Sequence, residues 1–253
     1  HYPGELCASD FTHMSKLGIT ICGEMFRHLL YHFTLTYSNW EAGSVCFSES
    51  FESLSAGFQN ALWQLGGVPL RHRLDRMSAA VNKDCNPEQW TRRYQALMRH
   101  YGIEPQRTNA ARANENGDIE QRHYRLKKAI DQALILRGSR DFPSRGEYDE
   151  FLKEIFKQLN SGRLNRFKEE LGVLRVLPYQ RMDACKIIDK SVGPSSTIYV
   201  RNNTYSVHSR LIGENVRVKL YLDYVEVWHG QQMAERIPRM RGEGKHQIQY
   251  RHI

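Results

Sequence analysis

The sequence lacks several features that define whole classes of protein. No apolar run approaches the length needed to cross a bilayer, and the first 30 residues contain neither the charged nor the apolar region of a signal peptide. The five cysteines are scattered, they form no CxxC pair, and no Cys/His group has zinc spacing. We therefore expect reduced thiols in an intracellular protein, without structural zinc and without a membrane partner.

Internal repeats and low-complexity tracts are also absent from the 253 residues. Apolar residues make up 40% of the chain and charged residues 25%, which is a globular composition rather than a disordered one. The length suffices for one or two domains with a buried core. Because the chain begins at His1 without a Met, we expect a fragment of a longer protein.

Acidic side chains are in the minority, with 28 Asp and Glu against 36 Lys and Arg and a net charge of +8. The surplus is concentrated: residues 90–145 hold twelve basic residues against six acidic ones, and residues 236–253 hold five against one. Such concentration is typical of proteins that bind a phosphate backbone. A basic but inert surface remains the alternative.

The first half of the chain alternates between strand and helix patterns. Period-two alternation and β-prone residues predict strands, whereas apolar spacings of three and four, closed by Gly or Pro, predict helices. The predicted strands cover residues 4–14, 17–26, 27–38, 70–75 and 103–111, and the predicted helices cover residues 51–65, 87–101 and 118–134. The Asn116-Gly117 pair predicts a turn before the last helix.

The second half is different in pattern. Residues 146–161 and 165–172 have helical spacing and are expected to form a connector, and after Pro178 short strands alternate with turns, including an Asn202-Asn203 hairpin turn. The tail from Arg236 is expected to be a flexible basic arm. The predicted domains are a catalytic core over 1–140, a helical linker over 141–177 and a small all-β module, sandwich or barrel, over 178–253.

Three acids occupy defined places in this order of elements, which is that of a ribonuclease-H-like core with a mixed five-stranded sheet and helices. Asp10 lies within the first strand, where Asp is disfavoured, Asp75 ends the fourth strand, and Glu120 begins the last helix. In this topology the three positions converge on one edge of the sheet. Each has a simpler explanation: a strand-end Asp, a cap, and an acid that complements a helix dipole.

Converging carboxylates repel one another unless cations lie between them. Hard oxygen ligands select Mg²⁺ or Mn²⁺, and two such ions would support in-line phosphoryl transfer without a covalent protein nucleophile. Asp10, Asp75 and Glu120 are therefore the candidate catalytic and metal-binding residues.

Basic and aromatic residues near the acids are candidate DNA contacts. Tyr124 and Lys127 follow Glu120 by four and seven residues and so share its helix face, although solvated lysines are the alternative. His123 lies on the apolar face and is interpreted as a core histidine rather than a ligand. The full set of candidate DNA-binding residues is Tyr124, Lys127, Lys128, Arg76, His72, Arg73, Arg201, Arg239 and Arg241.

Three stretches carry a resemblance to a known family: "HYPGELCASDF", "LDRMSAAV" and "ENGDIEQRHYRLKKAI". With Gly117, Asp118, Ile119 and Glu120 fitting a Gly-x-hydrophobic-Glu motif, the chain resembles DDE transposases of the retroviral-integrase superfamily, most closely the IstA-type transposases of bacterial insertion sequences. "FKEELGVLRVLP" resembles the linker before that family's β-barrel, and residues 198–236 resemble the barrel. Arg76 stands where the family commonly has Asn, and Ala8-Ser9 where it commonly has Gln-Val.

The resemblance implies an activity and its partners. A metal-activated water, with Mg²⁺ or Mn²⁺ and two ions expected, would cut DNA at the terminal inverted repeats of a transposon, and the exposed 3′-OH would attack double-stranded target DNA. The resemblance also implies a homo-multimer, a dimer or tetramer, on paired ends, an AAA+ ATPase partner, helix-turn-helix domains upstream, and a location at the nucleoid in the bacterial cytoplasm. A ribonuclease-H-like nuclease that cuts without joining, or a non-catalytic DNA-binding scaffold, are the alternatives.

Overall fold

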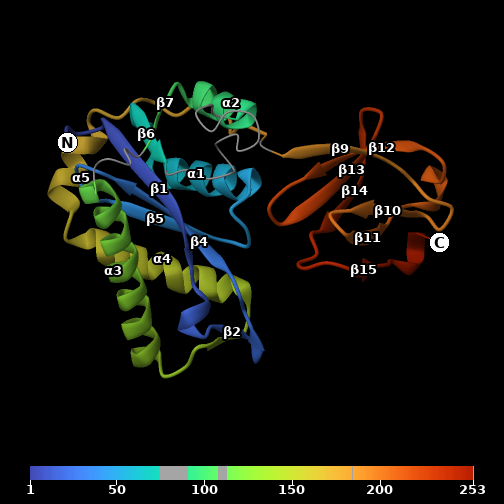
Figure 1. Cartoon of the computed structure of the whole chain (residues 1–253), viewed down its shortest axis with the longest axis horizontal. Coiled ribbons are helices and arrows are strands. Elements are labelled where there is room, and N and C mark those ends of the chain that lie inside the picture. Colours follow the sequence, from blue (N-terminus) through green and yellow to red (C-terminus); the bar gives the residue numbers. More distant parts are fainter. Residues whose placement is uncertain (75–90, 108–112, 184, 253) are drawn as a thin grey trace. The chain divides into compact units, whose positions relative to one another are not determined.

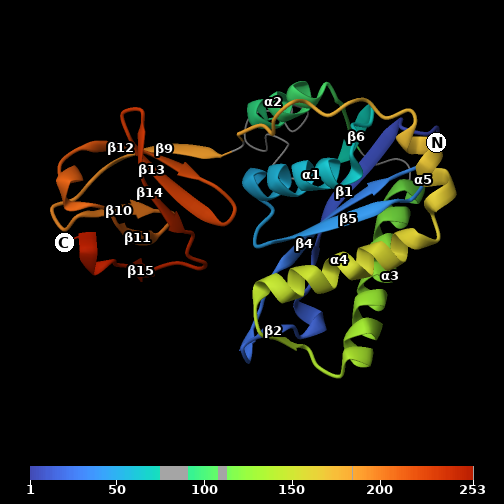
Figure 2. The same ribbon diagram turned by 180° about the vertical axis from the view of Figure 1, so that it is seen from behind.

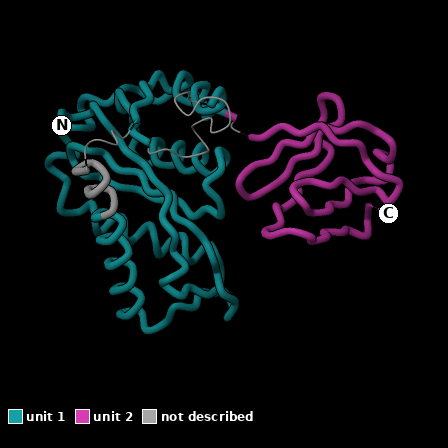
Figure 3. Tube along the Cα trace, in the orientation of Figure 1, with its two compact units in different colours: residues 1–182 teal, residues 183–253 magenta. Residues whose placement is uncertain are grey.

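The computed structural model describes residues 1–74, 91–107, 113–183 and 185–252, and for residues 113–120 it describes the backbone only. The chain divides into two compact units, residues 1–182 and residues 183–253 (Figure 3). Each unit has its own hydrophobic core and is described separately.

A five-stranded mixed sheet organises the first unit, with the strand order β5-β4-β1-β6-β7 (Figure 1). The central strand β1 pairs antiparallel with β4 and parallel with β6, and β4 and β6 pair with the outer strands. The strands are β1 (Leu6–His13), β4 (Leu29–Leu35), β5 (Glu41–Cys46), β6 (Arg71–Leu74) and β7 (Glu104–Arg107). This confirms the predicted ribonuclease-H-like sheet.

Helices cover both faces of this sheet (Figures 1 and 2). They are α1 (Phe51–Leu65), α2 (Arg92–Tyr101), α3 (Ala113–Arg137), α4 (Arg145–Ser161) and α5 (Leu164–Leu171). All seven residues of β4 are buried, because its alternate side chains meet α1 on one face and the α3–α4 layer on the other. Two glycines allow this packing: a Cβ on Gly57 of α1 would lie 2.4 Å from the ring of Tyr31, and a Cβ on Gly43 of β5 would lie 2.5 Å from the ring of Phe156.

Helix α1 shows why sequence and structure agree where local signals are strong. The Ser50 side chain accepts a hydrogen bond from the Ser53 N–H at the N-terminus, and Gly66 ends the helix in the left-handed conformation at a φ of 81°. The predicted apolar face is buried, so the helix over 51–65 is confirmed.

The second predicted strand, over residues 17–26, is wrong as a strand of the main sheet. It forms a small hairpin of β2 (Thr20–Ile21) and β3 (Glu24–Met25) that pairs with β8 (Asp141–Phe142). The strand that completes the main sheet is β5, which the sequence pattern missed because Glu41 and Gly43 interrupt its apolar alternation.

The turn predicted at Asn116-Gly117 is also wrong, since α3 already begins at Ala113 and includes both residues. The predicted apolar face of this helix is confirmed over its described part: Leu126, Ile130 and Leu134 are buried in the core.

The two helices expected in a linker belong to the first unit. Tyr148, Leu152, Ile155 and Phe156 of α4 complete the core cluster that contains Leu30 and Val45 of the sheet, together with the apolar face of α3. Helix α5 packs through Phe167, whose ring stacks on Trp40 with centroids 5.6 Å apart. These helices therefore have a structural part in the first unit.

The second unit consists of strands in two sheets, with the orders β14-β13-β12-β9 and β10-β11-β15. The strands are β9 (Lys186–Ser191), β10 (Thr197–Val200), β11 (Asn203–Ser206), β12 (Asn215–Leu220), β13 (Tyr224–His229), β14 (Gln232–Pro238) and β15 (His246–Gln247). An all-β module is thus confirmed, but the sheets do not close into a barrel in the part of the chain that the structure describes.

Two details of this unit correct the sequence interpretation. The hairpin turn consists of Arg201 and Asn202, at φ values of 50° and 61°, while Asn203 already belongs to β11. The tail is a folded part of the unit rather than a flexible arm, because β15 pairs with β11 and His252 is buried against Ser206.

Over the described residues, no helix has the length and apolar character required of a membrane span.

Candidate metal and nucleic-acid site

Asp10 is the one candidate acid whose side chain the structure describes. It lies on the central strand β1, directly opposite His32 of β4. The Phe11 N–H donates to Asp10 Oδ1 at 2.8 Å, and the side chain is 30% exposed. Asp10 therefore presents a hard oxygen donor that is oriented by the backbone and still accessible, as an Mg²⁺ or Mn²⁺ ligand must be.

The neighbouring strand β6 leads to the second acid. Leu74, its last residue, is in register with Ser9, which precedes Asp10. Asp75, which follows Leu74 in the chain, and Arg76 lie outside the described residues.

Helix α3 carries the third acid and contacts the first. The backbone of Glu120 is helical, and His123, three residues further on, has its Nδ1 atom 3.9 Å from Asp10 Oδ2. Positions three residues apart share a helix face, so this face of α3 adjoins Asp10. Among the described residues no three His, Cys, Asp or Glu side chains form a metal site, and the side chains of Asp75 and Glu120 are not among them.

His123 is uncharged at neutral pH. Burial, followed by the nearby His32 and Lys127, lowers the pKa of His123 to about 3. A neutral imidazole therefore lies beside the Asp10 carboxylate, with Nδ1 of His123 3.9 Å from Oδ2 of Asp10.

The candidate DNA contacts of α3 differ in exposure. Tyr124 is 65% exposed and Lys128 is exposed, whereas Lys127 is half-buried. Burial, and then the charge of Lys16, lowers the pKa of Lys127. Lys16, which follows β1 in the chain, is the cation that sequence reasoning missed, since no pattern links it to α3.

The two candidates on β6 are buried. His72 has no exposed surface, and its ring nitrogens lie 2.7 Å from Ser9 Oγ and 2.9 Å from the Tyr94 hydroxyl. Burial lowers its pKa to about 3. Arg73 beside it is 8% exposed. The structure therefore places His72 in the core, away from any phosphate at the surface.

The three candidates in the second unit lie in or near turns. Arg201 is exposed in the β10–β11 turn. Arg239 donates to the backbone oxygen of Tyr221 at 2.7 Å, and Arg241 pairs with Asp223 at 2.6 Å. The last two arginines thus stabilise the unit whatever else they contact.

A mixed sheet with Asp10 on its central strand and helices on both faces defines a ribonuclease-H-like fold, which a separate all-β unit follows in the chain. One chain in the cryo-EM structure of the simian T-cell lymphotropic virus intasome in complex with PP2A regulatory subunit B56 gamma shares this fold. The TM-score is 0.52 at 13% sequence identity, over 93% of this chain and 76% of that chain.

Similarities in sequence point to transposases within this fold class. Residues 177–249 match the family model of the Mu transposase C-terminal domain. The whole chain is 41% identical to the uncharacterized protein y4jA/y4nE/y4sE of Sinorhizobium fredii and covers 52% of it. It is 26% identical over 236 residues to the transposase for insertion sequences IS1326/IS1353 of Pseudomonas aeruginosa, which corresponds to 88% of this chain and 45% of that protein.

These similarities confirm the resemblance to transposases of the integrase superfamily that the sequence motifs indicated. The chain spans about half the length of the curated relatives that it matches.

Proposed function

We propose that the chain is the catalytic part of a DNA transposase, which cuts at transposon ends and transfers the resulting 3′-OH into target DNA. The observation that carries the proposal is the approach of His123 to within 3.9 Å of Asp10, because it brings the helix that carries Glu120 to the central strand. The register of Leu74 with Ser9 supports the same convergence, since Asp75 is the next residue in the chain.

In this proposal Asp10, Asp75 and Glu120 hold two Mg²⁺ or Mn²⁺ ions. When bound, such ions polarise the attacking oxygen and stabilise the leaving oxygen of an in-line phosphoryl transfer. The Phe11 N–H fixes one oxygen of Asp10, so that the other is presented toward α3. The neutral His123 lies beside this carboxylate and forms no ion pair with it.

The DNA backbone is assigned to the exposed and half-buried residues of α3, Tyr124, Lys127 and Lys128, together with Lys16. A phosphate between Lys16 and Lys127 would relieve the repulsion that contributes to the lowered pKa of Lys127. Arg76, Arg201, Arg239 and Arg241 remain proposed contacts, whereas we assign none to the enclosed His72 or to the buried Arg73. Binding of paired ends by a homo-multimer and assistance by an AAA+ ATPase are proposed from the family resemblance.

The test is strand transfer by the protein, with pre-cut transposon-end DNA, a target plasmid and Mg²⁺ or Mn²⁺. Asp10→Asn, Asp75→Asn and Glu120→Gln should each abolish joining. Glu104→Gln is the matched control, because this acid lies on the same sheet but its side chain is 74% exposed and paired with Arg71.

The alternatives give different results when uncut transposon ends are supplied as well as pre-cut ones. Cleavage of uncut ends without joining identifies a nuclease. Joining that survives Glu120→Gln contradicts the assignment of the third acid. DNA binding without cleavage or joining, unchanged by loss of all three acids, identifies a scaffold.

A further inference from the structure

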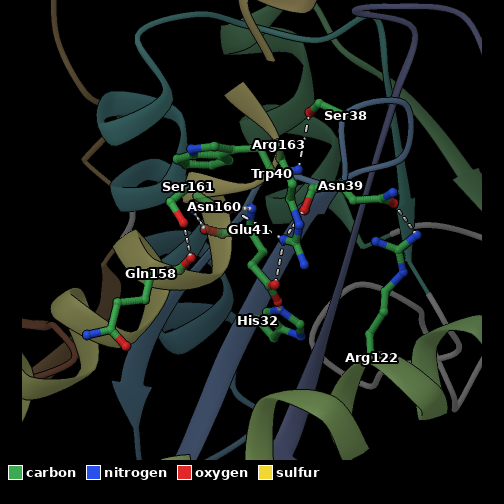
Figure 4. Close-up of polar contacts among 10 residues, drawn as sticks. All are labelled: His32, Ser38, Asn39, Trp40, Glu41, Arg122, Gln158, Asn160, Ser161 and Arg163. Atoms are coloured by element: carbon green, nitrogen blue, oxygen red, sulfur yellow. Dashed lines mark hydrogen bonds and ion pairs between the residues drawn. The ribbon is translucent and has the colours of Figure 1, made fainter. Parts of the chain in front are cut away.

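A polar cluster with a buried centre adjoins the proposed metal site without belonging to it. Its centre is Glu41, the first residue of β5, which is 5% exposed. Glu41 Oε2 lies 2.7 Å from His32 Nε2, and Glu41 Oε1 accepts a hydrogen bond from Arg163 Nη1 at 2.6 Å (Figure 4). We call His32, Asn39, Glu41, Asn160 and Arg163 the Glu41 cluster.

The backbone at Glu41 is held as well as its side chain. The Glu41 N–H donates to Asn160 Oδ1 at 2.9 Å, and Asn160 Nδ2 donates to the Glu41 carbonyl at 2.7 Å. Arg163 also donates to the carbonyl of Asn39. The β4–β5 hairpin and the α4–α5 junction are thereby joined at one point.

Glu41 remains charged in this environment. Burial acts to raise its pKa, but the hydrogen bond from His32 and the charges of His32 and Arg163 outweigh burial and lower the pKa of Glu41. Burying such charges contributes little net stability, because the desolvation cost offsets the attraction. Stability alone is therefore a weak reason for this cluster.

The cluster reaches α3 through two consecutive residues that closely follow Glu120. Arg122 Nη2 donates to Asn39 Oδ1 at 2.8 Å (Figure 4). The ring of His123 packs against that of His32, with centroids 5.4 Å apart. His32 is also the register partner of Asp10.

The Glu41 cluster thus includes His32, which lies opposite Asp10 in the sheet, and it contacts the turn of α3 that follows Glu120. We infer that the Glu41 cluster is a positioning site, which fixes α3 against β1 and so sets the distance between Glu120 and Asp10. The inference rests on the proposed function, in which both acids bind metal. No residue of the cluster is assigned a contact with metal or DNA.

Asn39→Gly is the cleanest variant for a test. Asn39 has a φ of 61°, which Gly adopts readily, so this change removes the amide that Arg122 contacts and preserves the turn. Asn202→Gly is the matched control, since Asn202 has the same φ of 61° in a turn of the other unit. Glu41→Gln is the stronger variant, because it removes the charge that pairs with Arg163.

The measurement is the affinity of the full chain for Mn²⁺ in the presence of pre-cut end DNA, followed by the electron paramagnetic resonance of the free ion. Loss of a residue that orients a metal ligand typically weakens metal binding by about 10- to 100-fold. We expect a weakening of about tenfold for Asn39→Gly, more for Glu41→Gln and no change for Asn202→Gly, with Asn39→Gly still folded in the absence of metal.

Asp10→Asn distinguishes a failure of the proposed metal site from a failure of the positioning role. If Asp10→Asn leaves Mn²⁺ binding intact, the proposed metal site itself is wrong. If Asp10→Asn weakens Mn²⁺ binding but Asn39→Gly matches Asn202→Gly in affinity, the positioning role is overturned and the metal site stands. Should Glu41→Gln fail to fold, Asn39→Gly decides the question alone.

Discussion

Single buried histidines give the first unit a defined response to acid. His28 is 2% exposed, with Nε2 located 2.9 Å from the Tyr148 hydroxyl, and His72 is enclosed between Ser9 and Tyr94. Burial lowers the pKa of His28 to about 4 and that of His72 to about 3. Both therefore stay neutral in the folded chain at pH values where an unfolded histidine, with a pKa near 6.5, is charged.

We predict that stability falls as the pH is lowered from about 6.5 to about 4. In this window the unfolded state binds more protons than the folded state, so each histidine reduces the free energy of unfolding by about 1.4 kcal/mol per pH unit. Urea unfolding at several pH values should show a slope that His28→Gln makes shallower by about 1 kcal/mol per pH unit. The exposed His13 supplies the control, His13→Gln. An unchanged slope in His28→Gln would contradict the neutral buried histidine.

At the scale of single residues, the sequence made Asp10 and Lys127 candidates by their place in a strand and on a helix face. It could not identify Lys16, His32 or Glu41 as neighbours of the site. Lys16 and Lys127 are brought together by tertiary packing, and so are Glu41 and Arg163, which are 122 residues apart. His72 was misjudged for the same reason, because no local signal distinguishes a strand end at the surface from one enclosed by Ser9 and Tyr94.

Whole elements were predictable where local signals were sufficient. Helix α1 has a cap at each end and an apolar spacing of three and four, and its bounds follow from these features. Strand β5 has no such local signal. Glu41 is accommodated in the strand because it pairs with His32 and Arg163. Gly43 is needed because the ring of Phe156 occupies the space that a side chain would fill.

The β10–β11 turn offers a prediction that separates folding from DNA binding. Both turn residues have positive φ, which costs about 1 kcal/mol for Arg but less for Asn. Arg201→Asn should therefore raise the free energy of unfolding by about 0.5 kcal/mol. If Arg201 contacts a phosphate, the same change reduces by about one the number of counterions released on DNA binding, which is measured as a shallower dependence of log K on log salt concentration.

Urea unfolding and DNA titration at several salt concentrations measure the two effects of Arg201→Asn. Arg210→Asn is the control, since Arg210 is exposed in the same unit and lies outside the turn. Destabilisation by Arg201→Asn would show that the charge, rather than the backbone conformation, dominates at this position.

At the scale of the whole chain, two independent cores indicate two folding units. The core of the second unit is formed by apolar residues of its two sheets and connecting segments, among them Ile198, Tyr205, Val218 and Val227. Domains of this size have a small margin of stability, on the order of 3–5 kcal/mol.

We predict that residues 183–253 fold when expressed alone. Circular dichroism and urea unfolding should show a cooperative transition with a free energy of unfolding of about 3 kcal/mol. Val218→Asp, which buries an unpaired charge at a fully enclosed position, should abolish this transition. A fragment that stays unfolded as wild type would show that the second unit depends on the first.

The buried carboxylate of Glu170 in α5 has a consequence for the synthesis of the chain. Its two oxygens accept hydrogen bonds from the N–H groups of Gly4 and Ser38, each at 3.1 Å. Since Gly4 and Glu170 are 166 residues apart, the loop before β1 cannot obtain this partner until nearly the whole first unit has left the ribosome. In a nascent chain halted before residue 170, the segment before β1 and the β4–β5 turn therefore still lack these hydrogen bonds, and α5 is the element that supplies them last.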